Sequence, residues 1–305
     1  METAMLRQEK FDQADTLRSL TGQRSGSTSG QSLRRGAARV ISVTSGKGGV
    51  GKTAVTTNVA VALARQGQRV LIIDADLGLA NIDVMFGLTP QYTLNHYFSG
   101  EKGLSEILVE GPEGIHILPA GSGVQAVTRL DREQKMCFIN EMEALDSDFD
   151  VVLIDTEAGI SENVTYFNTA AQEILVVTAP EPTAITDAYA LMKLLSTRYQ
   201  EKRFKLVVNS VRSGEEGLEV YRKLTMVSSR YLDISIDYLG GIPFDRRMRE
   251  SITRQKAIVE LFPNIKASCA FEALAKNLAA PQHSSQPKGG VEFFWRRLLS
   301  MGQEG

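Results

Sequence analysis

The octapeptide that starts at residue 46 reads Gly46-Lys47-Gly48-Gly49-Val50-Gly51-Lys52-Thr53 and fits the pattern GxxxxGK[ST]. The segment before it, residues 40–44, is β-branched and apolar, which is typical of a buried parallel strand. The segment after it, residues 54–64, carries apolar residues at helical spacing. The pattern therefore stands in the strand-loop-helix context that a P-loop requires.

The residue types of this loop suit a nucleoside triphosphate and Mg²⁺. The glycines let the backbone curl, so that its N–H groups and those of the helix start at Ala54 can point at phosphate oxygens. Lys52 is expected to neutralise the β- and γ-phosphates, and the Thr53 hydroxyl is expected to hold Mg²⁺. The alternative, a plain glycine-rich turn of a doubly wound fold, is disfavoured by the complete pattern in this context.

Lys47 is one cation more than phosphate binding needs. From its place early in the loop it should point away from its own nucleotide, so it is either a solvated lysine or a group for another molecule's phosphates. The sequence KGGVGKT of residues 47–53 resembles the deviant Walker A ATPases of the MinD/ParA family. That resemblance implies a homodimer around ATP, in which Lys47 reaches the partner's nucleotide and Lys52 acts within its own subunit.

Two apolar strands that end in aspartates extend the resemblance. Residues 69–76 read RVLIIDAD, which by resemblance is switch I, with Asp74 near the Mg²⁺ shell and Asp76 positioning the attacking water. Residues 149–159 read FDVVLIDTEAG, in which Asp155 matches the Walker B carboxylate that holds Mg²⁺ through water. The alternative for Asp74 and Asp76 is that they cap a helix starting near Ala80.

Glu157 departs from the family, which usually has proline or a small residue at this place. A carboxylate so close to the γ-phosphate would repel it unless the side chain points outward. We therefore expect ATP hydrolysis to be slow and dependent on a partner.

The composition fits one large α/β core with extensions. The 305 residues are 43% hydrophobic and 23% charged, and the net charge of −2 gives no overall basic footprint for nucleic acid. Cys137 and Cys269 stand far apart, without a CxxC or Cys/His cluster, which predicts a reduced, cytoplasmic setting and no metal centre. Neither an apolar run of transmembrane length nor a signal-peptide pattern is seen.

Apolar strands alternate with helical patterns over residues 39–280, which predicts a doubly wound, mostly parallel sheet flanked by helices. The nucleotide should lie at the carboxyl ends of the strands. We expect residues 1–38 to be a flexible arm, and residues 281–305 to be a hinge followed by a helix. The predicted strands lie near residues 39–45, 69–74, 115–119, 150–155, 173–178, 204–210 and 236–242.

Three residues after the later strands match the places where the MinD/ParA family contacts adenine. They are Asn209, Pro243 and Asp245. Without the resemblance, each would be read as part of an ordinary strand-end loop.

The N-terminal arm carries a second, more specific resemblance. It contains Phe11-Asp12-Gln13-Ala14-Asp15-Thr16-Leu17-Arg18, which matches the DQAxxLR element of the FlhG/FleN proteins that control flagellar number and placement. Phe11, Ala14 and Leu17 recur every third residue, so a short helix would present one apolar stripe beside Gln13 and Arg18, ordered only on a partner. The resemblance implies that this partner is the SRP-type GTPase FlhF, whose GTP hydrolysis the helix stimulates. The alternative is a frayed terminus.

Residues 180–191, PEPTAITDAYAL, are similar to a segment of the same FlhG/FleN family. Read physically, Thr183 is expected to cap a helix with a buried stripe formed by Ala188, Leu191, Met192 and Leu195.

The C-terminal segment has one apolar helical face with arginines elsewhere on the wheel. The spacing i, i+3, i+4, i+7, i+8 is typical of an amphipathic helix that lies in a membrane interface. In the family this segment targets the membrane, and the alternative is a helix that docks on the ATPase body. The face consists of Val291, Phe294, Trp295, Leu298 and Leu299.

Together, these resemblances imply an ATP-dependent dimerising switch of the FlhG/FleN type, similar over about residues 11–299. They imply ATP and Mg²⁺ as cofactors, a cytoplasmic location with reversible binding to the anionic inner membrane, FlhF as partner, and no direct nucleic-acid contact. A flagellar transcription regulator or switch-complex protein is a further candidate partner. Two alternatives stay open: a MinD-like division-site regulator, which would lack the arm, and a ParA-like DNA-segregation factor, which should show a basic patch. A metal-cluster carrier is disfavoured by the absence of paired cysteines.

Overall fold

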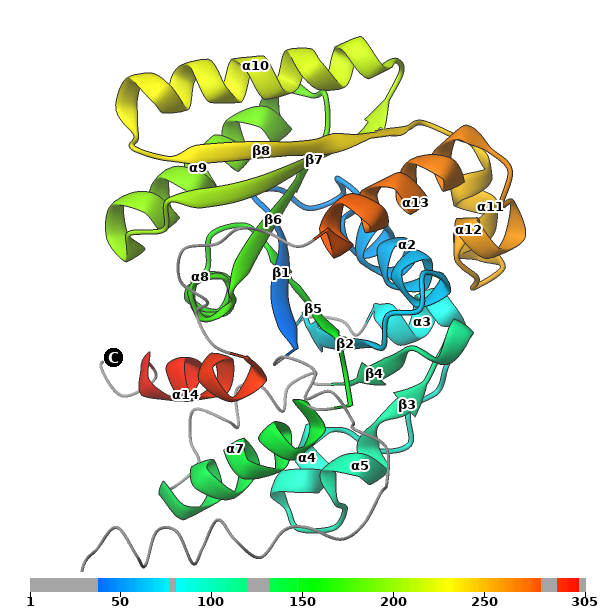
Figure 1. The fold of residues 1–305 in the computed structure, drawn as a ribbon, viewed down its shortest axis with the longest axis vertical. Coiled ribbons are helices and arrows are strands. Elements are labelled where there is room, and N and C mark those ends of the chain that lie inside the picture. Colours follow the sequence, from blue (N-terminus) through cyan, green and yellow to red (C-terminus); the bar gives the residue numbers. More distant parts are fainter. Residues whose placement is uncertain (1–37, 77–80, 120–131, 147, 281–289, 302–305) are drawn as a thin grey trace, which may run out of the picture. The chain divides into compact units, whose positions relative to one another are not determined.

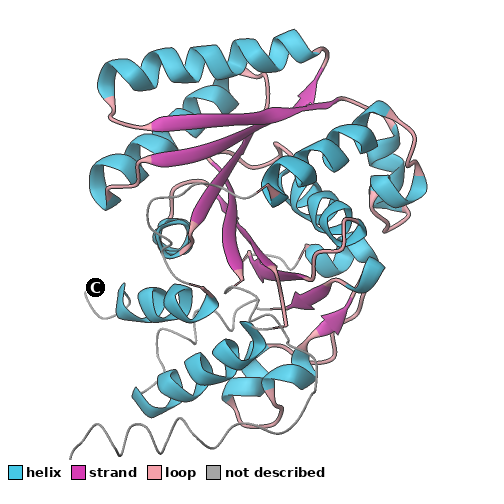
Figure 2. Cartoon of the chain, in the orientation of Figure 1, coloured by secondary structure: helices cyan, strands magenta, loops and turns pink. Residues whose placement is uncertain are grey.

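The computed structural model describes residues 38–76, 81–119, 132–146, 148–280 and 290–301. The described residues from Ala38 onward belong to one compact unit that contains an eight-stranded sheet (Figures 1 and 2). The strand order is β3-β4-β2-β5-β1-β6-β7-β8. The strands are β1 (Arg39–Ser45), β2 (Val70–Ala75), β3 (Val109–Glu110), β4 (His116–Leu118), β5 (Val151–Ala158), β6 (Glu173–Thr178), β7 (Arg203–Val211) and β8 (Ser235–Pro243).

Helices connect these strands and cover the sheet. They are α2 (Lys52–Arg65), α3 (Ile82–Phe86), α4 (Leu94–Phe98), α5 (Leu104–Ile107), η1 (Pro112–Gly114), α7 (Arg132–Asp146), α8 (Glu162–Ala170), α9 (Pro182–Tyr199), α10 (Gly214–Tyr231), α11 (Arg247–Thr253), α12 (Ile258–Leu261), α13 (Lys266–Ala279) and α14 (Val291–Met301).

Alternate residues of each central strand pack into different layers. In β2, Val70 and Ile72 join the apolar cluster under α2, α12 and α13, whereas Leu71 and Ile73 join the cluster under α7, α8 and α14. Because both faces are covered, the central strands read as continuous apolar runs. The fold is therefore the predicted doubly wound, mostly parallel sheet.

The seven predicted strands are confirmed, with small shifts at their ends. The sequence missed β3, which has two residues and pairs antiparallel with β4 at the edge of the sheet. An antiparallel pair this short leaves no alternating pattern to detect.

The carboxyl ends of the three central strands bring the motifs together. β5 lies between β1 and β2, and its Asp155 is in register with Val43 of β1 and Asp74 of β2. The P-loop follows β1 directly, so the loop and both aspartates share one edge of the sheet. Within the described residues, no helix is both long and apolar enough to cross a membrane.

Candidate functional site

The P-loop connects β1 to α2 in a conformation that requires glycine. Gly49 and Gly51 adopt φ values of +82° and +86°, in the left-handed region that side chains rarely occupy. A Cβ atom on Gly46 would lie 2.1 Å from the carbonyl oxygen of Asp187 in α9. The glycines thus permit both the curl of the loop and the close approach of a neighbouring helix.

A fully buried carboxylate, that of Asp155, organises the base of the loop. Lys52 Nζ lies 2.8 Å from Asp155 Oδ1, and Thr53 Oγ1 donates a hydrogen bond of 2.8 Å to Oδ2. Thr56 Oγ1 donates a further hydrogen bond of 2.7 Å to Oδ1. A buried charge is tolerated only when it is paired and hydrogen-bonded in this way. Thr56 was not predicted as a site residue, although its position one helical turn after Lys52 places it on the same side of α2.

This donor set fits a magnesium nucleotide. A threonine hydroxyl and a carboxylate are ligands of the kind that Mg²⁺ prefers, and Thr53 and Asp155 supply them side by side. Lys52 Nζ is buried and has no hydrogen-bond acceptor in good geometry in the described chain, apart from its charge contact with Asp155. Apart from this contact its N–H groups have no acceptor among the described residues, and binding of phosphate oxygens by Lys52 stays a prediction.

Asp74 holds the segment that leads into α3. Its carboxylate accepts hydrogen bonds from the backbone N–H groups of Asp76, Asn81 and Ile82, at 3.1 to 3.2 Å. Burial and the neighbouring charge of Asp155 raise the pKa of Asp74 to about 7, against the lowering effect of these three bonds. Asp74 thus acts as the cap that the sequence left open as an alternative, and α3 begins at Ile82 rather than near Ala80. A contribution of Asp74 to the Mg²⁺ shell stays a prediction.

Asp76 lies beside this cap. One of its carboxylate oxygens accepts a hydrogen bond of 3.4 Å from Asn81 Nδ2. Its role in positioning water stays a prediction, and residues 77–80 lie outside the described part of the chain.

Lys47 contacts α9 of its own chain. Its Nζ atom donates a hydrogen bond of 2.8 Å to Thr183 Oγ1 and lies 3.3 Å from Glu181 Oε2. The predicted cap at Thr183 is wrong, because α9 begins at Pro182 and the Thr183 hydroxyl serves Lys47 instead. The buried stripe of α9 at Ala188, Leu191, Met192 and Leu195 is confirmed. The contact with a partner's nucleotide stays a prediction for Lys47.

Glu157 directs its carboxylate toward the start of α8. Its Oε2 atom accepts a hydrogen bond of 3.3 Å from Ser161 Oγ, the N-cap of that helix. A helix N-terminus is a favourable place for a negative charge. This geometry fits the outward orientation that the sequence analysis named as the condition for avoiding repulsion of a phosphate.

Of the three predicted adenine residues, Asn209 lies near the end of β7, Pro243 ends β8, and Asp245 follows two residues later. Asn209 Nδ2 donates a hydrogen bond of 2.8 Å to the Val50 carbonyl, so Asn209 clamps the P-loop. Pro243 ends β8 opposite Val211, and Asp245 receives both the backbone N–H and the guanidinium of Arg247. The hydrogen bond from the Arg247 side chain is the main cause that lowers the pKa of Asp245. Contact with adenine stays a prediction for all three.

Comparisons with known proteins identify the family of this chain. A family model described as ParA, a NUBPL iron-transfer P-loop NTPase, matches residues 36–279. The antiactivator FleN of Pseudomonas aeruginosa is 45% identical over 261 residues, which are 86% of this chain and 93% of that protein. The chain belongs to the FlhG/FleN group of the MinD/ParA family of P-loop ATPases.

Two further similarities support this family. The flagellum site-determining protein YlxH of Helicobacter pylori is 32% identical over 269 residues, or 87% of this chain and 91% of that protein. The solved structure of the septum site-determining protein MinD from Pyrococcus horikoshii, complexed with Mg-ADP, is similar with a TM-score of 0.63 and 27% identity. The match covers 79% of this chain and 96% of that one, so the FlhG/FleN chain shares its fold with a magnesium-nucleotide protein.

The C-terminal helix of this FlhG/FleN chain is docked on the ATPase body. It lies beside α7 and α8 (Figure 1). All five residues of its predicted membrane face are buried. Trp295 meets the ring of Phe138 at 4.7 Å, and Phe294 stacks on Phe167 at 6.2 Å. Trp295 Nε1 is buried without a hydrogen-bond partner in the described chain. The amphipathic helix is therefore confirmed, and in this structure its apolar face covers protein.

The arm motif at residues 11–18 lies outside the described residues, so its predicted contacts stay predictions.

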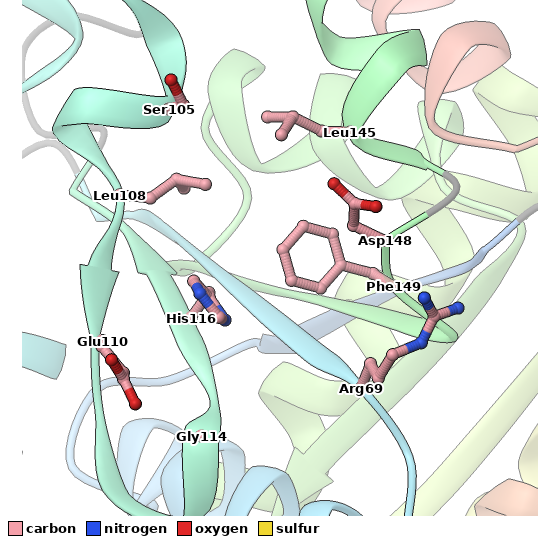
Figure 3. A pocket seen from close by; sticks show the side chains of 9 residues that line it. All are labelled: Arg69, Ser105, Leu108, Glu110, Gly114, His116, Leu145, Asp148 and Phe149. Atoms are coloured by element: carbon pink, nitrogen blue, oxygen red, sulfur yellow. The ribbon is translucent and has the colours of Figure 1, made fainter.

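A pocket at the opposite edge of the sheet takes no part in this site (Figure 3). It lies where β2, β4 and β5 begin, between Glu110 and His116 on one side and Leu145 and Phe149 on the other. The His116 and Phe149 rings lie 5.5 Å apart, and the guanidinium of Arg69 pairs with Asp150 at 2.9 Å. The pocket is therefore separated from the nucleotide edge by the length of the strands.

Proposed function

We propose that this chain is an ATP-driven, dimerising switch that controls flagellar number or placement. The observation that carries the proposal is the joint presence of a complete P-loop built around Asp155 and a likeness to FleN along 93% of that protein. One relative is named an antiactivator and another a flagellum site-determining protein. The experiment is to count flagella on Pseudomonas aeruginosa cells that lack FleN, with and without this chain. Restoration of the parental number supports the proposal, and an unchanged number contradicts it.

In the proposed reaction, the protein binds ATP and positions water. The loop N–H groups and Lys52 hold the phosphates, while Thr53 and Asp155 hold Mg²⁺, which neutralises phosphate charge when bound. Asp76 orients the attacking water from the segment that Asp74 fixes. We expect slow turnover in the isolated protein, because completion of the site awaits a second subunit and a partner.

Dimerisation requires Lys47 to change partners. Within one chain its ammonium group is held by Thr183 and Glu181, and it is 38% exposed, so little desolvation opposes its release. A phosphate of the second subunit's ATP offers more negative charge than one carboxylate. We expect ATP, and not ADP, to draw Lys47 across the interface.

Membrane binding requires α14 to leave the body. The buried Trp295 Nε1 group without an acceptor costs about 1–3 kcal/mol, whereas at a membrane interface the indole N–H meets water or head groups. This cost weakens the packing of α14 on the ATPase body, which favours reversible exchange of α14 between the body and the inner membrane. A dimer would carry two such helices and bind more tightly than a monomer.

The chain provides its own reporter for that exchange, because Trp295 is its only tryptophan. Mg-ATP with anionic vesicles should shift the Trp295 emission and bring the protein down with the vesicles. Mg-ADP should do neither. Emission that never changes while the protein still sediments would place the membrane contact elsewhere.

The arm supplies the proposed link to an SRP-type GTPase of the FlhF kind. A glutamine offered in trans can orient an attacking water, so a peptide of residues 1–38 should stimulate GTP turnover of that partner. Gln13→Ala should keep most of the binding and lose the stimulation, whereas Leu17→Asp should lose both. If the unmodified peptide has no effect on GTP turnover, the proposed link is wrong.

A further inference from the structure

A basic and apolar surface lies next to the nucleotide edge and has no role in the proposed function. We call it the α3–α11 surface and define it by Val84, Phe244, Arg246, Arg249, Ile252 and Lys256. Residues 246–256 contain five cations and one acid, Glu250. Two of the cations are paired, Arg247 with Asp245 at 2.9 Å and Arg254 with Glu250 at 2.7 Å. Arg246, Arg249 and Lys256 are exposed and form no ion pair with any described residue.

The same surface exposes three large apolar side chains. Phe244 is 64% exposed, Val84 57% and Ile252 42%. Contact between the two segments is direct, because Gln255 Nε2 donates a hydrogen bond of 3.1 Å to the Val84 carbonyl. Arg246, Arg249 and Ile252 recur every third residue, which places them along one side of α11 and its N-cap. Cations and exposed apolar groups therefore alternate along residues 244–256, and Val84 of α3 lies next to this segment.

This surface and α14 lie on opposite faces of the sheet. Met248 of α11 packs on the apolar cluster of α2 and α13, whereas α14 packs on the cluster across the sheet. The surface also adjoins two segments of the predicted nucleotide site, and its Phe244 stands between the predicted adenine residues Pro243 and Asp245. On one side Asp74 caps the entry to α3, and on the other Asp245 follows β8.

We propose that the α3–α11 surface binds an acidic protein segment that carries apolar anchor residues. Unpaired arginine and lysine side chains favour carboxylates, and exposed aliphatic and aromatic groups among arginines are typical of protein interfaces. A DNA backbone would engage the cations and would leave Phe244, Val84 and Ile252 without matching contacts. The inference does not depend on the flagellar role.

The test uses the full chain and a labelled synthetic peptide of about 15 residues in which Asp and Glu alternate with Leu and Phe. We expect binding by fluorescence anisotropy that weakens as salt rises. Arg249→Glu with Lys256→Glu should weaken it roughly tenfold or more. The matched control, Lys223→Glu with Arg230→Glu on α10, removes two exposed cations elsewhere and should leave affinity within about twofold.

A second pair of measurements separates the apolar contribution and the nucleic-acid alternative. Val84→Ser with Ile252→Ser should weaken peptide binding by several-fold and leave its salt dependence unchanged. A DNA duplex of about 20 base pairs should bind more weakly than the peptide at equal salt. The proposal is overturned if the peptide does not bind, if the α10 control weakens binding as much as the α11 pair, or if DNA binds more tightly through the same residues.

Discussion

The P-loop and the C-terminal helix differ in how their sequence patterns relate to their surroundings. Both were predicted from short local patterns of about the same length. In the P-loop, Lys52 and Thr53 contact the buried Asp155, and the loop has the strand-loop-helix context that the pattern predicts. In α14, the apolar face forms as predicted, but it packs on α7 and α8 in the place where a membrane was expected.

The difference teaches what each kind of pattern specifies. A P-loop pattern fixes the chemistry of its own backbone and side chains, so the surrounding fold adds little to its interpretation. An amphipathic pattern predicts only that one face of the helix is removed from water, and either a protein surface or a lipid surface can cover that face. Predictions about α14 therefore depend on whether its apolar face binds α7 and α8 or the membrane.

The largest effect is expected at Lys52. Lys52→Ala should lower ATP turnover by roughly 100-fold or more, because it removes a charge aimed at the phosphates. It also leaves the buried Asp155 without its cation, so binding of a fluorescent ATP analogue should be measured with turnover. Lys47→Ala is the matched control, since it removes the other lysine of the loop and should leave analogue binding to the monomer intact. Equal loss of analogue binding in both variants would contradict the division of roles.

The second-largest effect is expected for substitutions in α14. Phe294→Glu with Leu298→Glu should abolish ATP-dependent sedimentation with anionic vesicles and should also undock α14, since both side chains are buried. Trp295 emission should then be shifted even without ATP, while ATP binding stays intact. The exposed Phe293→Glu is the control and should leave the docked emission unchanged. Retained sedimentation of the double variant would show that α14 is only a part of the body.

A smaller effect is expected at Asn209. Asn209→Ala leaves the Val50 carbonyl without its donor and should lower the free energy of unfolding by about 1–3 kcal/mol. Urea unfolding measures this change. Asn277→Ala removes an exposed bond to a carbonyl and should cost less than about 0.5 kcal/mol. An equal loss of unfolding free energy at the two positions would mean that the bond from Asn209 to Val50 stabilises the fold no more than an exposed hydrogen bond does.

The smallest effect is expected at Glu157. Because its carboxylate lies on Ser161 at the start of α8, Glu157→Ala should change ATP turnover by less than about twofold. A rise well beyond twofold in phosphate release would show that the carboxylate faces the nucleotide during turnover.

Much of the fold was predictable because its signals are local. Buried parallel strands such as β5 are continuous apolar runs, and the strand-loop-helix around Lys52 needs no distant contact for its interpretation. The family resemblance implied that Asp74 and Asp155 both lie near Mg²⁺, and the structure places them on neighbouring parallel strands that end at the same edge.

The remaining features depend on contacts between distant segments. The capping of α3 by Asp74, the bond from Asn209 to Val50 and the pairing of Lys47 with Thr183 each join residues whose spacing carries no pattern. Thr183 shows the difficulty most clearly, because a threonine near a helix start favours a cap on statistical grounds. Its hydroxyl instead accepts a hydrogen bond from Lys47, which lies 136 residues away in the sequence.

The central claim is that ATP drives dimerisation through Lys47. Light scattering of the Asp76→Ala variant, which is expected to retain ATP, tests it most directly. With Mg-ATP this variant should have the mass of a dimer, with Mg-ADP that of a monomer, and Lys47→Ala in the same background should stay monomeric with either nucleotide. Equal dimerisation with and without Lys47 would contradict the claim.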